Sequence, residues 1–516
     1  MGAASTAPPP SRARGRRTAS ESPLPHTIVP APVLVEPRPG AAFTLAPDAE
    51  VRVPQGSPGA RDVGELLAEL LRPSTGYPLP VVEGTAGPGV VLLLEGAAAE
   101  VGAEGYELDT AGDTAVIRAN TPAGLWSGVQ TLRQLLPAAV ESPERQDGPF
   151  TAPAVHVLDH PRFPHRGVML DVARHFFGVA DVKRYLDLAV AHKVNTLHLH
   201  LSDDQGWRLE IESWPNLTAH GSTSSVGGGP GGFYTQDDYR EIVAYAARRH
   251  VTVVPEIDLP GHTAAALSSY PELNPDGIAP KLYTGIEVGF STLDIASETT
   301  YRFVADVLRE VAALTPGPYL HIGGDEAFAT EPEDYRAFMA RVLPMVEEHG
   351  KRAMGWSEFT RADLPATAVA QYWDTERPPG PELAEAAARG VRFVLSPANR
   401  VYLDMKYTEE TELGLKWAGT VEVDASYDWD PATLLDGVPE SAVLGVEAPL
   451  WTETLTTTDE LEFMAFPRLA SAAEVGWTRA AGRDWSEFRS RLAAQGPRWA
   501  SRGVAFHRSP TVPWQG

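Results

Sequence analysis

Cysteine is absent from this chain of 516 residues. Disulfide bonds, thiolate nucleophiles and cysteine-ligated metal sites are therefore excluded. No run of apolar residues is long enough to span a bilayer, so no transmembrane helix is predicted. Basic residues are few: 43 Lys and Arg stand against 68 Asp and Glu, which gives a formal net charge of −25. An acidic surface repels phosphate groups, so we expect neither nucleic acid nor a membrane as a partner.

The N-terminal segment is rich in Pro, Ala and Ser and has four arginines. We predict a disordered basic arm over residues 1–27. Arg16 and Arg17 resemble the start of a twin-arginine signal, but no apolar segment follows before Pro23. No secretion signal is therefore predicted, and the sequence assigns neither a cellular location nor an oligomeric state.

Residues 28–160 mix strand-like and helix-like patterns, which predicts a small α+β domain. Pro161 and Pro164 mark its end. No catalytic constellation is visible within it. The predicted strands are 43–45, 51–53, 90–94, 106–109 and 115–119, and the predicted helices are 60–71 and 125–136.

From residue 161 to residue 510 the pattern is a strand, a polar strand end and usually a helix, repeated eight times. The predicted strands are 167–172, 196–201, 251–257, 319–322, 352–356, 368–373, 392–395 and 444–450. Amphipathic helices are predicted, for example, over 182–191, 237–247 and 299–314. Eight such units predict an α/β fold, a (β/α)8 TIM barrel. A doubly wound open sheet is the alternative, but the chain has no glycine-rich dinucleotide turn.

The segment YLHIGGDE, residues 319–326, is the most informative part of the chain. A short apolar strand runs through two glycines into Asp325 and Glu326, at the strand end where an α/β barrel carries its chemistry. We expect the glycines to remove side-chain bulk so that a substrate can approach the backbone. The plainer interpretation of the two acids is a polar strand end that opens the next helix.

Acidic, basic and aromatic residues follow all the other predicted barrel strands as well. In chain order they are Asp171, Arg174, His175, Asp203, Asp204, Asp258, His262, Trp356, Trp373, Tyr402, Asp404, Trp451 and Glu453. A single Trp at a strand end is more often core than ligand, and a single Asp is often a helix cap. Several tryptophans gathered with acids and one Arg are typical of a sugar pocket, because aromatic rings stack on pyranose faces and carboxylates bind hydroxyls.

Several ordered motifs resemble those of family-20 glycoside hydrolases, and most closely the actinobacterial β-N-acetylhexosaminidases. The motifs are MLDVARHF (169–176), HLHLSDDQGW (198–207), PEIDLPGH (255–262), HIGGDE (321–326), QYW (371–373), YLD (402–404) and APLWTE (448–453). The resemblance covers roughly residues 30–510, including the small α+β domain that the family carries before its barrel. It implies an exo-acting enzyme that hydrolyses terminal β-linked GlcNAc, and GalNAc as well, on chitooligosaccharides or glycoconjugates, without a cofactor or a metal. Members of this family are often secreted.

The resemblance also implies a role for each motif residue. Glu326 would be the general acid and base, and Asp325 would hold the acetamido N–H of the substrate. The remaining substrate-binding residues would be Arg174, Asp203, His262, Trp356, Trp373, Tyr402, Asp404, Trp417, Trp451 and Glu453. Among these, Tyr402 would donate to the acetamido oxygen, and Asp203 and His262 would form a supporting pair beside Glu326.

The adjacency of the two acids also limits the mechanism. The usual retaining glycosidase needs two carboxyl groups on opposite sides of the anomeric carbon, about 5–5.5 Å apart. Neighbouring residues such as Asp325 and Glu326 are poorly placed for that, so the nucleophile has to come from elsewhere. In the family that this chain resembles, the 2-acetamido oxygen of the substrate attacks and forms an oxazolinium-type intermediate.

Two other interpretations remain. His198 and His200 lie on one face of a strand and, with Asp203, His262 and His321, fit a metal-dependent barrel of the amidohydrolase type. In such barrels, however, the His-x-His motif normally falls on the first strand, and here it falls on the second. The other interpretation is an inactive sugar-binding protein, which would keep the aromatic residues and lose the acid.

Overall fold

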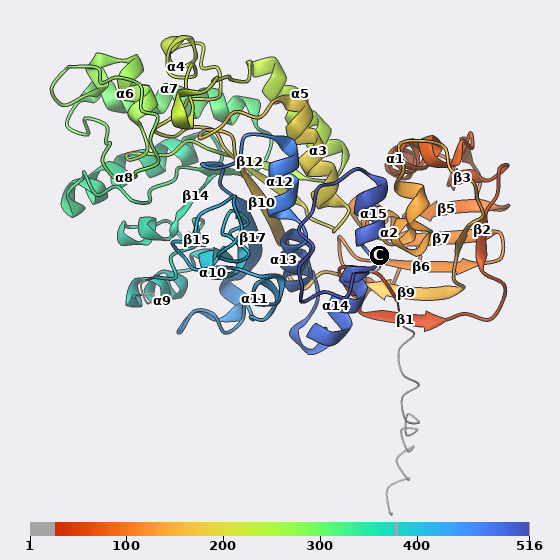
Figure 1. Cartoon of the computed structure of the whole chain (residues 1–516). Helices are drawn as coiled ribbons and strands as arrows, with labels where there is room; N and C mark the ends of the chain where they lie inside the picture. Colours follow the sequence, from red (N-terminus) through yellow and green to blue (C-terminus); the bar gives the residue numbers. More distant parts are fainter. Residues whose placement is uncertain (1–25, 377–379, 515–516) are drawn as a thin grey trace, which may run out of the picture.

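The computed structural model describes residues 26–376 and 380–514, which form a small sheet domain beside a barrel (Figure 1). Residues 1–25 of the predicted arm lie outside the described residues. The barrel and the α+β domain that precedes it are confirmed. Within the described part of the chain, no helix is both long and apolar enough to cross a membrane.

The small domain is a seven-stranded sheet with two helices on one face. The strand order is β1-β9-β6-β7-β5-β3-β4, and a separate two-stranded sheet joins β2 and β8. The strands are β1 (Leu34–Pro37), β2 (Phe43–Leu45), β3 (Glu50–Val53), β4 (Val81–Glu83), β5 (Gly89–Leu93), β6 (Tyr106–Ala111), β7 (Thr114–Ala119), β8 (Phe150–Ala152) and β9 (Val155–Asp159). The strands β1, β4, β8 and β9 were not predicted from the sequence. Three of these have only three or four residues, too few to show an alternating pattern.

The helices α1 (Pro58–Thr75) and α2 (Pro122–Leu135) begin and end at recognisable residues. Thr121 caps α2 by accepting a hydrogen bond from the backbone N of Gly124, and Pro122 occupies the first turn. Gly76 ends α1 in the left-handed region, with φ of 68°. Both helices were predicted from their apolar spacing.

The barrel consists of eight parallel strands, each paired with the next, and β17 closes it onto β10. The strands are β10 (His165–Asp171), β11 (Thr196–His200), β12 (Thr252–Glu256), β13 (Tyr319–His321), β14 (Arg352–Trp356), β15 (Val369–Tyr372), β16 (Arg392–Leu395) and β17 (Val443–Leu450). All residues of β10 and β11 are buried, as expected for strands covered on both faces. All eight predicted strands are confirmed, with shifts of one or two residues at their ends.

Helices cover the outside of the barrel. The longer ones are α3 (Val179–Val190), α5 (Gln236–Arg248), α7 (Glu298–Leu314), α8 (Pro332–Glu348), α9 (Pro381–Ala388), α12 (Thr458–Ala465), α13 (Arg468–Trp477) and α14 (Trp485–Ala493). Short helices lie in the connections: α4 (Asn216–Ala219), α6 (Ala264–Ser269), α10 (Ala398–Val401), α11 (Val423–Tyr427) and, near the C-terminus, α15 (Gly496–Ser501). Long connections follow β11, β12 and β16 and surround the carboxyl ends of the strands.

Buried polar contacts join the two domains. Lys193, at the end of the α3 unit, pairs with Asp159 of β9 at 2.7 Å, and both side chains are fully buried. Arg498 of α15 donates hydrogen bonds to the backbone oxygens of Arg133 and Gln134 at the end of α2. The Arg498 bonds satisfy carbonyl groups that a helix leaves unpaired at its C-terminus. Together with the buried ion pair, they fix the small domain against the barrel.

Candidate active site

A cavity of about 280 Å³ opens at the carboxyl ends of the barrel strands. Its lining contains nine of the twelve predicted site residues: Arg174, Asp325, Glu326, Trp373, Tyr402, Asp404, Trp417, Trp451 and Glu453. The other three, Asp203, His262 and Trp356, are almost completely buried behind this lining, with exposed fractions of 1–2%. Residues from distant parts of the sequence thus meet in one hollow at the face where barrels carry their chemistry.

The two glycines before the acidic pair have a different role from the one predicted. Gly323 and Gly324 have φ of +63° and +92°, a region that other residues rarely adopt. A Cβ atom on Gly323 would lie 1.7 Å from Oδ1 of Asp258, and one on Gly324 would lie 2.8 Å from the hydroxyl of Tyr335. The expectation that the glycines make room for substrate is therefore wrong: the space beside them is filled by protein side chains.

Asp258 and Tyr335 hold the turn that carries the two acids. The backbone N of Gly324 donates to Oδ1 of Asp258 at 3.0 Å, and the Tyr335 hydroxyl donates to the Gly324 oxygen at 2.7 Å. Glu326 itself has a positive φ of 44°. A non-glycine residue in this region is strained and persists only where its surroundings hold it, which is common at functional sites.

His262 faces both acids at once. Its Nε2 atom lies 3.4 Å from Oε2 of Glu326 and 3.6 Å from Oδ2 of Asp325. Its Nδ1 atom lies 3.2 Å from Oδ1 of Asp203, whose other oxygen pairs with Arg174 at 2.8 Å. Burial alone would lower the pKa of His262, but Asp203 and the other nearby carboxylates raise it well above its usual value. His262 is therefore a cation held between the supporting acid and the acidic pair.

The carboxyl group of Asp325 has a strongly raised pKa. Burial, together with Glu358 and Glu326, raises its pKa to about 7, although His262 acts in the opposite direction. Its Oδ1 atom is buried and has no hydrogen-bond partner among the described residues. A buried carboxylate oxygen of this kind is suited to accept an N–H from a ligand.

Aromatic rings form the walls of the cavity. Trp373 stacks on Tyr402 with ring centroids 6.4 Å apart, and Trp417 meets both rings edge-on. Trp451 tilts against Tyr402, and the guanidinium of Arg174 lies 4.8 Å from the Trp451 ring. Such a set of faces and edges, open on one side, fits a planar group or a sugar ring.

Two further acids close the cavity at the β16 and β17 ends. Burial and the nearby Glu453 raise the pKa of Asp404 well above its usual value. Burial also raises the pKa of Glu453, although Arg174 opposes the shift. Carboxyl groups that share such a space are suited to bind hydroxyl groups, because either protonation state offers a hydrogen-bonding atom.

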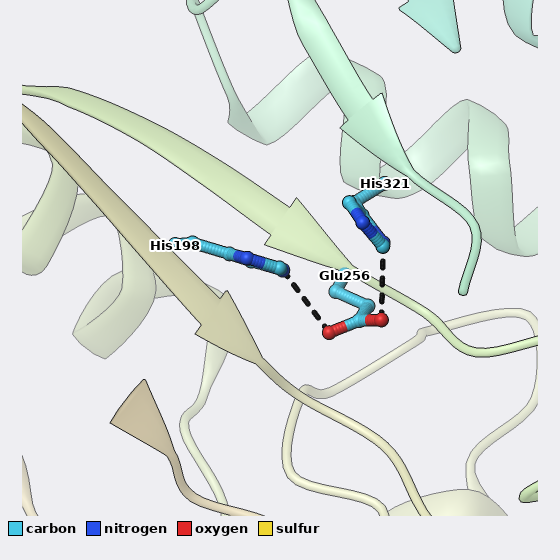
Figure 2. A group of neighbouring side chains, drawn as sticks. All are labelled: His198, Glu256 and His321. Atoms are coloured by element: carbon cyan, nitrogen blue, oxygen red, sulfur yellow. Dashed lines mark ion pairs between the residues drawn. The ribbon is translucent and has the colours of Figure 1, made fainter. Parts of the chain in front are cut away.

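The hydrogen bonds of Glu256 argue against the metal-dependent interpretation. The groups that lie within metal-binding reach of one another include His198, Glu256 and His321 (Figure 2). Each Glu256 oxygen, however, already has an N–H donor: Trp356 Nε1 at 2.7 Å and His200 Nδ1 at 2.5 Å. An indole N–H is only a donor and binds no metal. The carboxylate is thus neutralised by hydrogen bonds and by imidazoles, and the metal interpretation is not favoured.

Several residues of the site were not predicted from the sequence. Ile286 and Val288 line the cavity from the long connection after β12, where no periodicity points to them. Glu358 accepts a hydrogen bond from Trp373 just after β14. Glu256 had a visible signal, since a carboxylate inside an apolar strand needs a buried partner.

The sequence matches the family model "Glycosyl hydrolase family 20, catalytic domain" over residues 163–336 and 328–480. It matches "Glycosyl hydrolase family 20, domain 2" over residues 25–160. The chain therefore belongs to glycosyl hydrolase family 20, and it is a glycoside hydrolase.

Relatives within the family are similar over nearly the whole chain. A β-N-acetylhexosaminidase of Cellulomonas fimi is 45% identical, over 95% of this chain and 97% of the relative. The solved β-N-acetylhexosaminidase of Streptomyces coelicolor A3(2) is 54% identical, with a TM-score of 0.92 over 96% of this chain and all of the other. A mutant Streptomyces plicatus β-hexosaminidase in complex with the product GlcNAc is also 54% identical, with a TM-score of 0.92 over 96% and 98% of the two chains.

Proposed function

We propose that the chain is an exo-acting β-N-acetylhexosaminidase that removes terminal, non-reducing, β-linked GlcNAc, and GalNAc as well. The observation that carries the proposal is the Asp325–Glu326 pair, which ends a barrel strand inside an aromatic-walled cavity. The names of the relatives in Cellulomonas and Streptomyces, and the GlcNAc product bound to one of them, support the same activity. The proposed substrates are the non-reducing ends of chitooligosaccharides or of glycoconjugates.

The reaction proceeds with retention and without an enzyme nucleophile. Glu326 protonates the glycosidic oxygen, and the acetamido oxygen of the substrate attacks the anomeric carbon to give an oxazolinium-type intermediate. Glu326 then takes a proton from the water that opens this intermediate, so one carboxyl group serves as acid and then as base. His262, a cation 3.4 Å from Glu326, stabilises the carboxylate that exists between the two steps.

Asp325 acts on the acetamido group. As a carboxylate it accepts the acetamido N–H and stabilises the positive charge that develops on this nitrogen as the ring closes. The partner-free Oδ1 atom is the natural acceptor. Tyr402 donates to the acetamido oxygen and keeps the carbonyl aimed at the anomeric carbon, and the ring of Trp373 stacked beside it walls this part of the cavity.

The sugar ring is held by the remaining residues. Arg174, Asp404 and Glu453 bind its hydroxyl groups, and the Trp451 ring stacks under its apolar face. Trp417, with 39% of its surface exposed at the cavity mouth, contacts the aglycone. This assignment makes the buried side of the cavity the place of the terminal sugar, which explains an exo mode of action.

A panel of aryl β-glycosides tests the proposal. We expect hydrolysis of aryl GlcNAc and aryl GalNAc, and little hydrolysis of aryl glucose, which lacks the acetamido nucleophile. The activity should be insensitive to a chelator, and NMR should detect the β-anomer of GlcNAc first. An α-anomer as the first product contradicts substrate assistance, and activity that a chelator abolishes supports a metal-dependent barrel instead.

A further inference from the structure

Glu256 is a fully buried carboxylate that the proposed reaction does not use. It ends β12 inside the barrel, between His198 and His321 (Figure 2), and four nitrogen atoms lie within 3.0 Å of its two oxygens. Oε1 lies 2.7 Å from Nε1 of Trp356 and 3.0 Å from Nδ1 of His321. Oε2 lies 2.5 Å from Nδ1 of His200 and 3.0 Å from Nε2 of His198. The charged and polar neighbours thus come from β11, β13 and β14, the strands around it.

Two of these four neighbours, Trp356 and His200, contact residues that line or support the cavity. The ring of Trp356 packs against the ring of Trp451, with centroids 5.7 Å apart. His200 directs its second nitrogen, Nε2, to Oδ2 of Asp203 at 2.8 Å, and Asp203 accepts from His262. Two series of contacts therefore begin at Glu256. One runs through Trp356 to the cavity wall, and the other runs through His200 to the two catalytic acids.

The protonation of His200 follows from its neighbours. Both of its nitrogens face carboxylates, those of Glu256 and Asp203, so both must carry protons to donate. Burial alone would lower the pKa of His200, but Glu256 and Asp203 raise it well above its usual value.

The other groups facing His200 are Arg174, whose Nη1 lies 3.4 Å away, the edge of Trp451, and Asp258, which lies within 4.8 Å. Burial and Asp325 raise the pKa of Asp258 well above its usual value, which favours its neutral form. Since Arg174 is itself a cation, His200 depends on the two carboxylates for its charge.

We propose that Glu256 is a positioning residue for the hydrolysis: its carboxylate keeps His200 a cation, and this cation holds the Asp203–His262 pair in place beside Glu326. The same carboxylate orients Trp356 behind the cavity wall. The inference rests on the proposed function, because it concerns the geometry of that reaction. It predicts that a side chain with no direct contact to the cavity controls the rate.

The variant Glu256→Gln tests this dependence and keeps the size of the side chain. Without the carboxylate, His200 loses the negative charge that raises its pKa most, so it releases its proton at a lower pH. We expect kcat on an aryl GlcNAc to fall about 10- to 100-fold near neutral pH, the effect of a small displacement of catalytic groups. The deficit relative to wild type should shrink as the pH is lowered, because acid returns the proton to His200.

Glu447→Gln is the matched control. Glu447 is equally buried on β17 and contacts His165, His198 and Gln371 at 2.8–2.9 Å, but neither His200 nor Trp356. We expect this variant to keep kcat and its pH dependence close to those of wild type. An equal loss in Glu447→Gln and Glu256→Gln, or a deficit of Glu256→Gln that is the same at every pH, would assign both residues a structural role and overturn the proposal.

His200→Gln examines the same link from the other side, and it carries the test if Glu256→Gln does not fold. Its side chain is neutral at every pH, so we expect a similar loss in kcat that acid does not restore. A His200→Gln enzyme with the wild-type rate overturns the inference. Wild-type activity on the aryl GlcNAc separates the proposed function from the role of Glu256. An inactive wild type contradicts the proposed function itself. An active wild type with unaffected variants contradicts only the role of Glu256.

Discussion

The indole N–H of Trp373 donates a hydrogen bond of 2.9 Å to Oε2 of Glu358. Trp373 lines the cavity, and Glu358 follows β14 in the short helix Ser357–Arg361. Glu358 is also the first of the carboxylates that raise the pKa of Asp325. The aromatic wall and the acidic pair are therefore linked through a single side chain that no sequence motif identified.

Replacement of Glu358 by Gln should move the acid limb of kcat/KM to lower pH. Burial is the first cause of the raised pKa of Asp325 and stays unchanged, but the variant removes one like charge, so the pKa falls. In the proposed mechanism Asp325 acts as a carboxylate, and in the variant it reaches this form in more acidic solution. A pH profile on an aryl GlcNAc checks the shift, with Glu385→Gln, an exposed site on α9, as the control. An acid limb that moves to higher pH would contradict the assignment.

Replacement of Glu326 by Gln should remove the general acid while binding stays largely intact. The rate should fall about 10²- to 10⁴-fold, the usual contribution of a positioned acid. The loss should be smaller for aryl substrates with acidic phenol leaving groups, because these need little protonation. A series of such substrates measures the dependence, and equal losses across the series would show that Glu326 is not the acid.

Replacement of Asp325 by Asn should lower kcat although the residue touches no bond that breaks. Its proposed partner, the acetamido nitrogen, gains positive charge only as the substrate ring closes, so the lost interaction belongs to the transition state. A thiazoline analogue of the cyclised intermediate should inhibit wild type far more tightly than GlcNAc does. The Asn variant should lose much of that preference, and equal inhibition of both proteins would leave Asp325 a structural residue.

The Asp325→Asn variant should be more stable than wild type in alkaline solution, relative to their difference in acid. The pKa of Asp325 is about 7 in the folded protein, mainly because of burial, against an ordinary value of 3.8. Between these values the folded chain holds a proton that the unfolded chain has released, so stability falls as the pH rises through this window. The penalty is complete above pH 7 and is of the order of a few kcal/mol, at roughly 1.4 kcal/mol per pKa unit.

Urea unfolding of wild type and Asp325→Asn at pH 4 and pH 8 measures this effect. The free energy of unfolding of the variant minus that of wild type should be larger at pH 8 than at pH 4, because Asn has no proton to lose and does not acquire a buried charge. A difference between the two proteins that is the same at both pH values would contradict the raised pKa.

The barrel and its site were predictable because functional side chains come directly after the apolar run of each strand. Each apolar run ends in polar or aromatic residues such as Asp325 or Trp451, and the carboxyl ends of parallel strands necessarily meet at one face. Glu358 and Val288 were not predictable in this way, since they lie on connections without periodicity. Glu256 lies within a strand and appears as one polar residue in an apolar run. Only the closed barrel shows that four nitrogens from neighbouring strands converge on it.

The central claim is that the acetamido oxygen of the substrate, and not a side chain of the enzyme, attacks the anomeric carbon. A series of aryl β-GlcNAc substrates with zero, one, two or three fluorine atoms on the acetamido methyl group tests it most directly. Each fluorine withdraws electron density from the carbonyl oxygen without changing the leaving group. We expect kcat/KM to fall steeply with every fluorine added, and a kcat/KM independent of fluorine content would contradict the account.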